Sequence, residues 1–435
     1  MPKRLSFRQG LSSVLFWSII SAAFIGPGTV TIAARAGTDF RMQLLWALVF
    51  SIFATIVLQE AAARITIASG KNLGQIVARQ FSEGRARRLR WVLFGAVAFG
   101  CAAYQAGNLL GALSGLALID DLSQVWATLV LGAICFGFLW IGNFQQIARL
   151  LGFVVALMGL VFLAVALQSD VRAFELVEGT FRLAIPEGGA ILVIGLIGTT
   201  IVPYNLFLAS GISQGQDVRE MRTGLVLAIL IGGIISVAIM VVGSQLYGTF
   251  SFAGLAEALG EQLGRFATLF FSFGLFAAGL SSSITAPLAA AITAQSLLGE
   301  GRPQWQVRGR SFRMVWMLVL GVGLLFGILD VQPIPAIILA QAINGLLLPI
   351  ITAFLYMAVN DRTLLGEQYA NKPLSNILML LIVGITCFLG LNNVWKAIDR
   401  SLQLGMGQST SVLWSLGVLS AVLVVALGSR VARRR

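Results

Sequence analysis

The sequence contains no histidine, only three cysteines and few charged residues for its length. Without histidine, the commonest metal ligand and the commonest proton relay near neutral pH are both missing. Cys101, Cys135 and Cys387 lie in apolar stretches without CxxC spacing, which indicates a packing role. Charged residues make up 11% of the chain, against roughly 25% in soluble domains. Most of the outer surface must therefore face something other than water.

Other features that would mark an enzyme or a pump are also missing. No GxxxxGK[ST] loop is present, which argues against ATP-driven pumping by this chain. No polar stretch is long enough for a separate catalytic domain, and no small-residue cleavage site follows the first apolar stretch. We therefore expect a protein that is not an enzyme, holds no cofactor and keeps its first hydrophobic segment as a helix.

Long apolar runs fill the sequence instead. A helix needs about 20 apolar residues to cross a bilayer, and backbone exposed to lipid must form its own hydrogen bonds. The runs predict an all-α polytopic membrane protein with twelve spans, near residues 13–36, 43–64, 92–118, 125–142, 147–168, 188–211, 223–247, 266–297, 314–329, 333–357, 374–392 and 410–428.

The 30 Lys and Arg residues are distributed unevenly between the two sides of these spans. With twelve spans, most of them fall on the side that holds both termini, including the basic segment 71–90 and the C-terminal Arg433, Arg434 and Arg435. The positive-inside rule then predicts cytoplasmic termini in a bacterial-type cytoplasmic membrane. Because these residues sit in short loops next to spans, contact with lipid is expected and a nucleic-acid partner is not.

Two of the predicted spans are interrupted near their middle. The first contains Gly26-Pro27-Gly28-Thr29, and the sixth contains Pro203 after Gly198 and two threonines. Proline removes a backbone donor, and irregular backbone at membrane depth must be buried in protein or line a cavity. Paired interruptions five spans apart indicate the mid-membrane site of a secondary transporter built from inverted repeats. Two ordinary proline kinks are the simpler alternative.

Several short stretches of the chain resemble the Nramp family of metal-ion transporters. The family's Asp-Pro-Gly-Asn motif aligns with 26–29, and its sixth-span Met-Pro-His aligns with 202–204. The segments 43–46, 68–73 and 281–285 also resemble the family. The resemblance implies a LeuT-type fold with discontinuous first and sixth helices. It also implies a single transmembrane domain over 1–435, inverted repeats of five helices each over 13–168 and 188–357, and two peripheral helices over 374–428.

The family's metal ligands are not kept at the aligned positions. Gly26, Thr29 and Val202 stand where the family has its Asp, Asn and Met, and Tyr204 stands where it has its His. A divalent cation at mid-membrane without a carboxylate faces a large desolvation cost. This departure favours ion-coupled uptake of a small anion such as bicarbonate, held at the exposed helix N-termini. Transport of Mn²⁺ or Mg²⁺ is one alternative, and transport of a small amino acid or zwitterion is another.

The expected site residues cluster at the two interruptions. For the substrate they are Gly26, Pro27, Gly28, Thr29, Thr31, Thr199, Thr200, Pro203, Tyr204, Asn205 and Asn344, with Gln105 and Asn108 as further candidates. For Na⁺ as a coupling ion, LeuT-type proteins suggest Gly26, Thr29, Ala278, Ser281 and Ser282. For any single Thr or Asn, helix-to-helix hydrogen bonding is the simpler interpretation.

Further interpretations concern the remaining polar residues and other functional classes. Glu60 and Arg64 are four residues apart, so an intrahelical ion pair is expected, with a proton or cation relay at Glu60 as the minority interpretation. A channel would need rings of charge or carbonyls, and a membrane scaffold would need larger loops for docking. The sequence leaves open whether the protein is a monomer or a homodimer.

Overall fold

The computed structural model describes residues 25–79, 83–142, 145–213, 217–299, 302–402 and 409–433. These residues form helices joined by short loops and contain no β-strand. The part of the predicted first span that precedes Ile25 lies outside the described residues. In order, the helices are α2 (Pro27–Phe40), α3 (Leu45–Ser69), α4 (Leu73–Arg79), α5 (Glu83–Ala117), α6 (Gln124–Ile141), α7 (Gln145–Leu167), α8 (Ala173–Phe181), α9 (Ala190–Thr200), α10 (Pro203–Ile212), α11 (Val218–Gly243), α12 (Phe252–Leu263), α13 (Arg265–Leu298), η2 (Pro303–Trp305), α14 (Arg310–Ile328), α15 (Pro333–Val359), α16 (Arg362–Leu365), α17 (Pro373–Leu402) and α18 (Thr410–Ala432).

Eleven segments of the described chain are long and apolar enough to cross a membrane. They correspond to the second to twelfth predicted spans, with ends that differ by several residues. α5 begins at Glu83 and α13 covers 34 residues, so both extend beyond the predicted limits. The short helices α8 and α12 were not predicted, because each lies in a loop outside the apolar runs.

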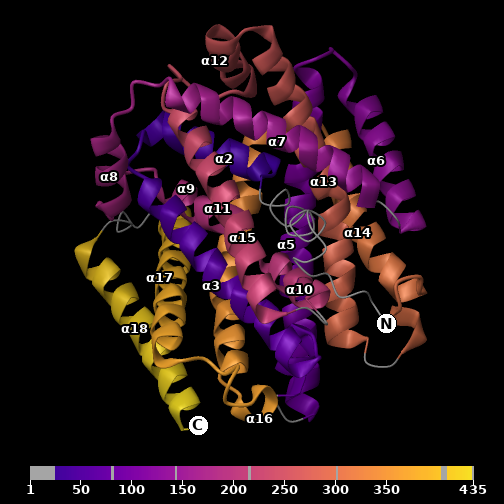
Figure 1. Cartoon of the computed structure of the whole chain (residues 1–435), viewed down its shortest axis with the longest axis vertical. Helices are drawn as coiled ribbons and strands as arrows, with labels where there is room; N and C mark the ends of the chain where they lie inside the picture. The colour runs from indigo at the N-terminus through magenta and orange to yellow at the C-terminus, as the bar shows by residue number, and fades with distance from the viewer. Residues whose placement is uncertain are drawn as a thin grey trace.

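The long helices pack as one bundle, with α17 and α18 at its edge (Figure 1). The segment Ala190–Phe207, which contains α9 and the start of α10, is 94% buried inside the protein, whereas only 6% of the α18 span is buried. α12 lies at one end of the bundle and α16 at the opposite end (Figure 1). The bundle therefore has an interior that excludes lipid and a C-terminal edge that does not.

Glycines let several helices approach one another closely at backbone level. A Cβ atom on Gly37 of α2 would collide with the Met240 carbonyl of α11, and one on Gly243 would collide with the Ala34 carbonyl. On α15, a Cβ atom on Gly345 would lie 2.6 Å from the Ile194 carbonyl of α9. Small residues permit this kind of packing between membrane helices. These contacts hold α2 against α11 and α9 against α15.

The helix ends differ in how they are capped. At the start of α11, the Asp217 side chain accepts hydrogen bonds from the backbone N–H groups of Arg219 and Glu220. Ser251 caps α12 in the same way through Gly254 N–H. The starts of α2 and α10 carry no side-chain cap, and each has proline at its first position. These two uncapped starts are the interruptions seen in the sequence.

Candidate functional site

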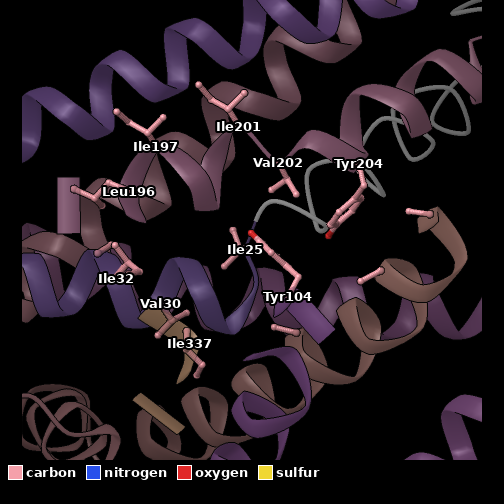
Figure 2. Packing of buried hydrophobic residues seen from close by; sticks show 14 of the residues in the cluster. Ile25, Val30, Ile32, Tyr104, Leu196, Ile197, Ile201, Val202, Tyr204 and Ile337 are labelled. Atoms are coloured by element: carbon pink, nitrogen blue, oxygen red, sulfur yellow. The ribbon is translucent and has the colours of Figure 1, made fainter. Parts of the chain in front are cut away.

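The ends of three helices meet at the interruptions. α9 ends at Thr200 and α10 begins at Pro203, and the residues between them, Ile201 and Val202, have non-helical backbone angles. α2 begins at Pro27 after an extended Gly26, with φ −98° and ψ 175°. Figure 2 shows Ile25 and Val202 facing each other across this region. The structure thus confirms the predicted break in the sixth span, and it describes the break in the first span from Ile25 onward.

Hydroxyl groups join the two interrupted segments. The Thr29 and Thr199 hydroxyls lie 3.1 Å apart and share a hydrogen bond. The Tyr104 hydroxyl of α5 donates to the Thr199 carbonyl at 3.2 Å. Thr31 donates within its own helix to the Pro27 carbonyl, and Thr200 donates to the Leu196 carbonyl. Of the predicted threonines, Thr29 and Thr199 therefore meet at the interruptions, while Thr31 and Thr200 reinforce their own helices.

Tyr204 and Asn205 lie in the first turn of α10. The Tyr204 ring packs edge-to-face on the Tyr104 ring, with centroids 5.6 Å apart (Figure 2). The Asn205 backbone N–H donates to the Val202 carbonyl, and its side-chain oxygen is buried without a hydrogen-bond partner among the described residues. An unpaired buried amide oxygen is costly. Asn205 therefore offers an acceptor that a bound solute or water could use.

Asn344 was predicted to face the same cavity, but its side-chain amide joins two helices. Its nitrogen donates to the Ala340 carbonyl of α15 at 3.0 Å and to the Gly100 carbonyl of α5 at 3.4 Å. A Cβ atom on Gly100 would lie 2.8 Å from its side-chain oxygen. Asn344 thus contacts α5 at Gly100, and it corresponds to the simpler interpretation given above.

Gln341, three residues before Asn344, is the residue that the sequence analysis missed. Its side chain is 1% exposed, and neither amide atom forms a hydrogen bond of normal geometry within the described residues. A Cβ atom on Gly28 would collide with the Gln341 amide, and the Tyr104 hydroxyl is also close to it. Gln341 therefore lies between Gly28 of α2 and the Tyr104 hydroxyl of α5, and that hydroxyl is the polar group that approaches its amide. A polar residue within an apolar span was the feature of the sequence that could have identified Gln341.

Gln105 and Asn108 of α5 also have buried amides without hydrogen-bond partners in the described part of the chain. A Cβ atom on Gly323 of α14 would lie 2.7 Å from the Gln105 side chain, so Gln105 contacts α14. Asn108 is one turn after Tyr104 and three residues before Gly111, which packs against Pro27. Helical periodicity thus puts Asn108 on the face of α5 that meets α2.

The predicted coupling-ion residues are only partly brought together. A Cβ atom on Gly26 would lie 3.4 Å from the Ser282 hydroxyl of α13. Ala278 is buried one turn earlier on the same side of α13. Ser281 is half-buried, and its carbonyl accepts a hydrogen bond from Thr285. Ser282 and Ala278 therefore lie on the side of α13 that meets Gly26, and Ser281 is rotated away from it.

The groups that could bind a solute at the interruptions are uncharged. Among the described residues, the buried set contains no Asp, Glu or Lys, and Arg64 is its only charged member. No group of three or more His, Cys, Asp or Glu residues forms a metal cluster in this part of the chain. The last carbonyls of α9 form the negative end of a helix dipole, as carbonyl ends do at cation sites of broken helices. The available chemistry is that of hydroxyl, amide and carbonyl oxygens.

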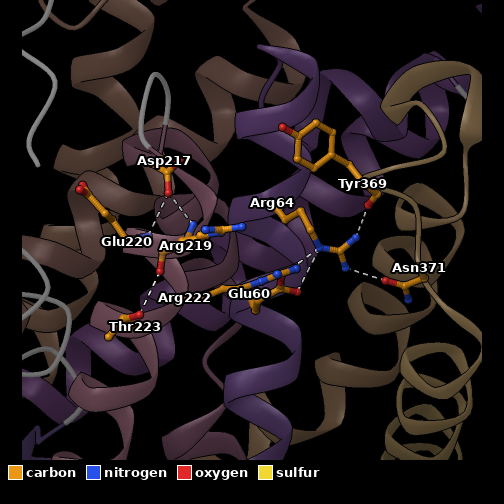
Figure 3. Close-up of polar contacts among 9 residues, drawn as sticks. All are labelled: Glu60, Arg64, Asp217, Arg219, Glu220, Arg222, Thr223, Tyr369 and Asn371. Atoms are coloured by element: carbon orange, nitrogen blue, oxygen red, sulfur yellow. Dashed lines mark hydrogen bonds and ion pairs between the residues drawn. The ribbon is translucent and has the colours of Figure 1, made fainter.

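Arg64 belongs to a separate polar network at the end of the bundle near α16 (Figures 1 and 3). Its Nε lies 3.0 Å from Glu60 Oε1, as predicted, and Arg222 Nε of α11 lies 2.8 Å from the same oxygen. Arg64 also donates to the Tyr369 carbonyl and to Asn371 Oδ1. The network joins α3, α11 and the loop before α17, so Glu60 holds helices together at one end of the bundle.

Comparison with a family model decides the family of the chain. The model of natural resistance-associated macrophage protein-like transporters matches residues 18–396. The chain belongs to the Nramp family. The match includes both interruptions and every helix that contributes to the site.

Similar proteins agree with this assignment. A divalent metal cation transporter MntH of Verminephrobacter eiseniae is 27% identical over 390 residues, 84% of this chain and 85% of its own. One from Deinococcus radiodurans is 25% identical over 86% of this chain and 87% of its own. The crystal structure of the Eremococcus coleocola manganese transporter in complex with an aromatic bis-isothiourea substituted compound matches with a TM-score of 0.71 at 19% identity, over 100% of this chain and 98% of that one.

The likeness extends to a more distant transporter. The structure of Mhp1, a nucleobase-cation-symport-1 family transporter in a closed conformation with bromovinylhydantoin bound, matches with a TM-score of 0.59 at 16% identity. It covers 97% of this chain and 92% of that one. Together these likenesses confirm the predicted LeuT-type fold of an integral membrane transporter.

The same comparisons correct the predicted solute. We expected a small anion such as bicarbonate, but the relatives that match most of the chain are named divalent metal cation transporters. The anion prediction is therefore wrong, as is the anionic partner. Its physical basis was incomplete: it considered the N-terminal ends of the broken helices and not the carbonyl end of α9, whose dipole has the opposite sign.

Proposed function

We propose that this Nramp protein carries a divalent metal cation across the membrane through a site where α2 begins and the α9–α10 helix is broken. Family membership and the names of the relatives support this assignment. The observation that carries it is the Gln341 amide, which is buried next to Gly28 with neither polar atom hydrogen-bonded in normal geometry among the described residues. A cation that takes the amide oxygen as a ligand would satisfy that oxygen, beside the nearby Tyr104 hydroxyl.

The donor set points to a hard cation that keeps part of its water shell. Soft metals favour sulfur and imidazole, and oxygen donors suit Mg²⁺ and Mn²⁺. Mg²⁺ gives up water reluctantly and needs few protein ligands. The oxygens of Thr29, Thr199, Asn205 and Gln341, with the last carbonyls of α9, supply neutral ligands of this kind. We therefore name Mn²⁺ and Mg²⁺ as the cargo.

Substitution of Gln341 tests the sign of the charge that the site binds. In proteoliposomes containing the purified protein, Gln341→Glu should lower the apparent KM for Mn²⁺, because a carboxylate binds the cation more strongly than an amide does. Gln341→Met should raise KM by roughly 10-fold or more, since hydrogen-bond partners of charged groups contribute about 1.5–3 kcal/mol. Mn²⁺ and Mg²⁺ uptake would be followed with fluorescent indicators inside the vesicles.

Asn392→Leu is the matched control for this experiment. Asn392 lies on α17, which forms neither interruption, and its buried side-chain oxygen also lacks a hydrogen-bond partner among the described residues. Its substitution should leave KM unchanged. A Gln341→Glu protein that loses Mn²⁺ uptake while Gln341→Met keeps it would contradict a cation site at this position.

We also propose Na⁺ as a coupling ion, held by Gly26, Thr29, Ala278 and Ser282, without the predicted Ser281, which is turned away from Gly26. The short separation between Gly26 and the Ser282 hydroxyl supports this set. Mn²⁺ uptake should then accelerate with an inward Na⁺ gradient, and Ser282→Ala should abolish the acceleration without abolishing uptake. Equal rates in Na⁺ and in choline would remove Na⁺ from the mechanism.

A further inference from the structure

A cavity of about 560 Å³ opens at the edge of the bundle between α15, α17 and α18. Its size falls within the range of roughly 300–1,000 Å³ that is typical of small-molecule sites. Twelve of its thirteen lining residues are not charged, and the thirteenth is Arg430. None of the lining residues is among the residues placed at the interruptions, so the cavity is separate from the transport site described above.

Small residues and loose packing create this groove. Gly390 of α17 lies against Pro349 of α15, with 3.8 Å between its Cβ position and the proline ring. Ala353 and Ala426 line the neighbouring walls. α18 packs on α17 and makes few contacts with α15. A space therefore stays open between α15 and α18. The groove is apolar along its length, as an acyl chain requires.

One end of the groove is basic. Arg430 lies in the last turn of α18, and no ion pair to it forms within the described residues. α17 runs antiparallel to α18, because Gly428 lies against Leu380 and Gly384 lies against Val424. Lys372, which precedes the first residue of α17, is therefore at the same end. This end belongs to the side of the bundle where basic residues predominate.

We propose that the groove binds one anionic phospholipid of the leaflet facing the basic loops. Its acyl chain would lie in the groove, and its phosphate would lie beside Arg430. Basic pockets between membrane helices on the cytoplasmic side recognise anionic head groups in this way. The charge at one end and the apolar walls over the remainder match the two parts of a phospholipid.

Native mass spectrometry of the purified full chain tests the proposal. The protein would be mixed with phosphatidylglycerol and phosphatidylcholine that carry identical acyl chains, and retained lipid would be counted. Phosphatidylglycerol should be retained about fivefold better, the factor expected for one basic contact of about 1 kcal/mol. Arg430→Gln should remove this preference. Arg433→Gln is the control, because Arg433 does not line the groove, and it should keep the preference.

A second pair of variants tests the groove itself. Gly390→Leu and Ala426→Leu fill it from α17 and from α18, so either should reduce retention of both lipids while the protein keeps its melting temperature. Equal retention of the two lipids by the unmodified chain would overturn the proposal, as would a preference that survives Arg430→Gln. A dimer that disappears when the groove is filled would also overturn it, because a second copy would then be the occupant.

Discussion

Gln341 and Gly28 form a pair in which the smaller residue sets the position of the larger one. A Cβ atom on Gly28 would collide with the end of the Gln341 side chain, which is flexible, and not with backbone. Gly28→Ala should therefore cost about 1 kcal/mol of folding free energy, the low end of the cost of overpacking, while it pushes the amide out of place. We expect a KM for Mn²⁺ several-fold higher and a nearly unchanged melting temperature.

Gly95→Ala is the control for that variant. Gly95 lies in α5 with open space around its Cβ position, so the substitution should change neither KM nor stability. If Gly28→Ala transports with an unchanged KM, the position of the Gln341 amide has no part in binding.

At the residue scale, the sequence predicted two of the side chains that meet at the interruptions, whereas its predicted solute was wrong. Thr29 and Thr199 were predicted and do meet, because the two interruptions bring them to the same depth. Asn344 was also predicted, yet its amide bonds α15 to α5. Gln341 differs from it by three positions on the same helix, and the sequence carries no information on which face of that helix meets Gly28. Loss of the family's acidic ligand suggested an anion, since carbonyl positions cannot be read from residue types.

At the scale of the helices, the Arg64 network should dominate the stability of the α3–α11 end of the bundle. Arg64 is 6% exposed and Arg222 is 52% exposed, although both contact Glu60. Removal of one partner from a buried pair costs about 3–5 kcal/mol, whereas an exposed pair contributes about 0–1 kcal/mol. Arg64→Met should thus lower the melting temperature in detergent far more than Arg222→Met does, and high salt should weaken only the Arg222 contact.

Equal effects of the two substitutions would show that the Tyr369 and Asn371 contacts of Arg64 contribute nothing. Uptake by Arg222→Met protein should stay close to that of the unmodified chain, because Glu60 keeps its contact with Arg64.

The sequence predicted those helices well that consist of long apolar runs. Eleven predicted spans correspond to eleven candidate membrane segments, and Pro203 marks the start of α10 as expected. The prediction failed for α8 and α12, which do not cross the bundle. α12 has an N-cap at Ser251 and polar residues along its surface. Because its sequence is amphipathic, it contains no long apolar run by which it could be recognised.

For the whole molecule, the distribution of basic residues predicts cytoplasmic termini, and accessibility can test it. In a variant without the three native cysteines, single cysteines would be placed at Tyr247, fully exposed in the loop after α11, and at Glu367, in the loop after α16. An impermeant maleimide added to intact cells should label Tyr247→Cys only. Labelling of Glu367→Cys alone would invert the topology. The two inverted repeats over 13–168 and 188–357 remain a prediction from the family resemblance.

The absence of buried acidic residues from the described bundle has an electrical consequence. Under the proposed function, a carrier with a neutral centre would return empty without moving charge, while each divalent cation would move two charges inward. At 100 mV, the membrane potential contributes about 2.3 kcal/mol per charge, so about 4.6 kcal/mol for each ion. An inside-negative potential set with valinomycin and K⁺ should therefore speed Mn²⁺ uptake strongly, and no effect would mean that a compensating charge moves with the ion. If uptake does speed up, the voltage that a cell maintains would drive the proposed metal uptake alongside the proposed Na⁺ gradient.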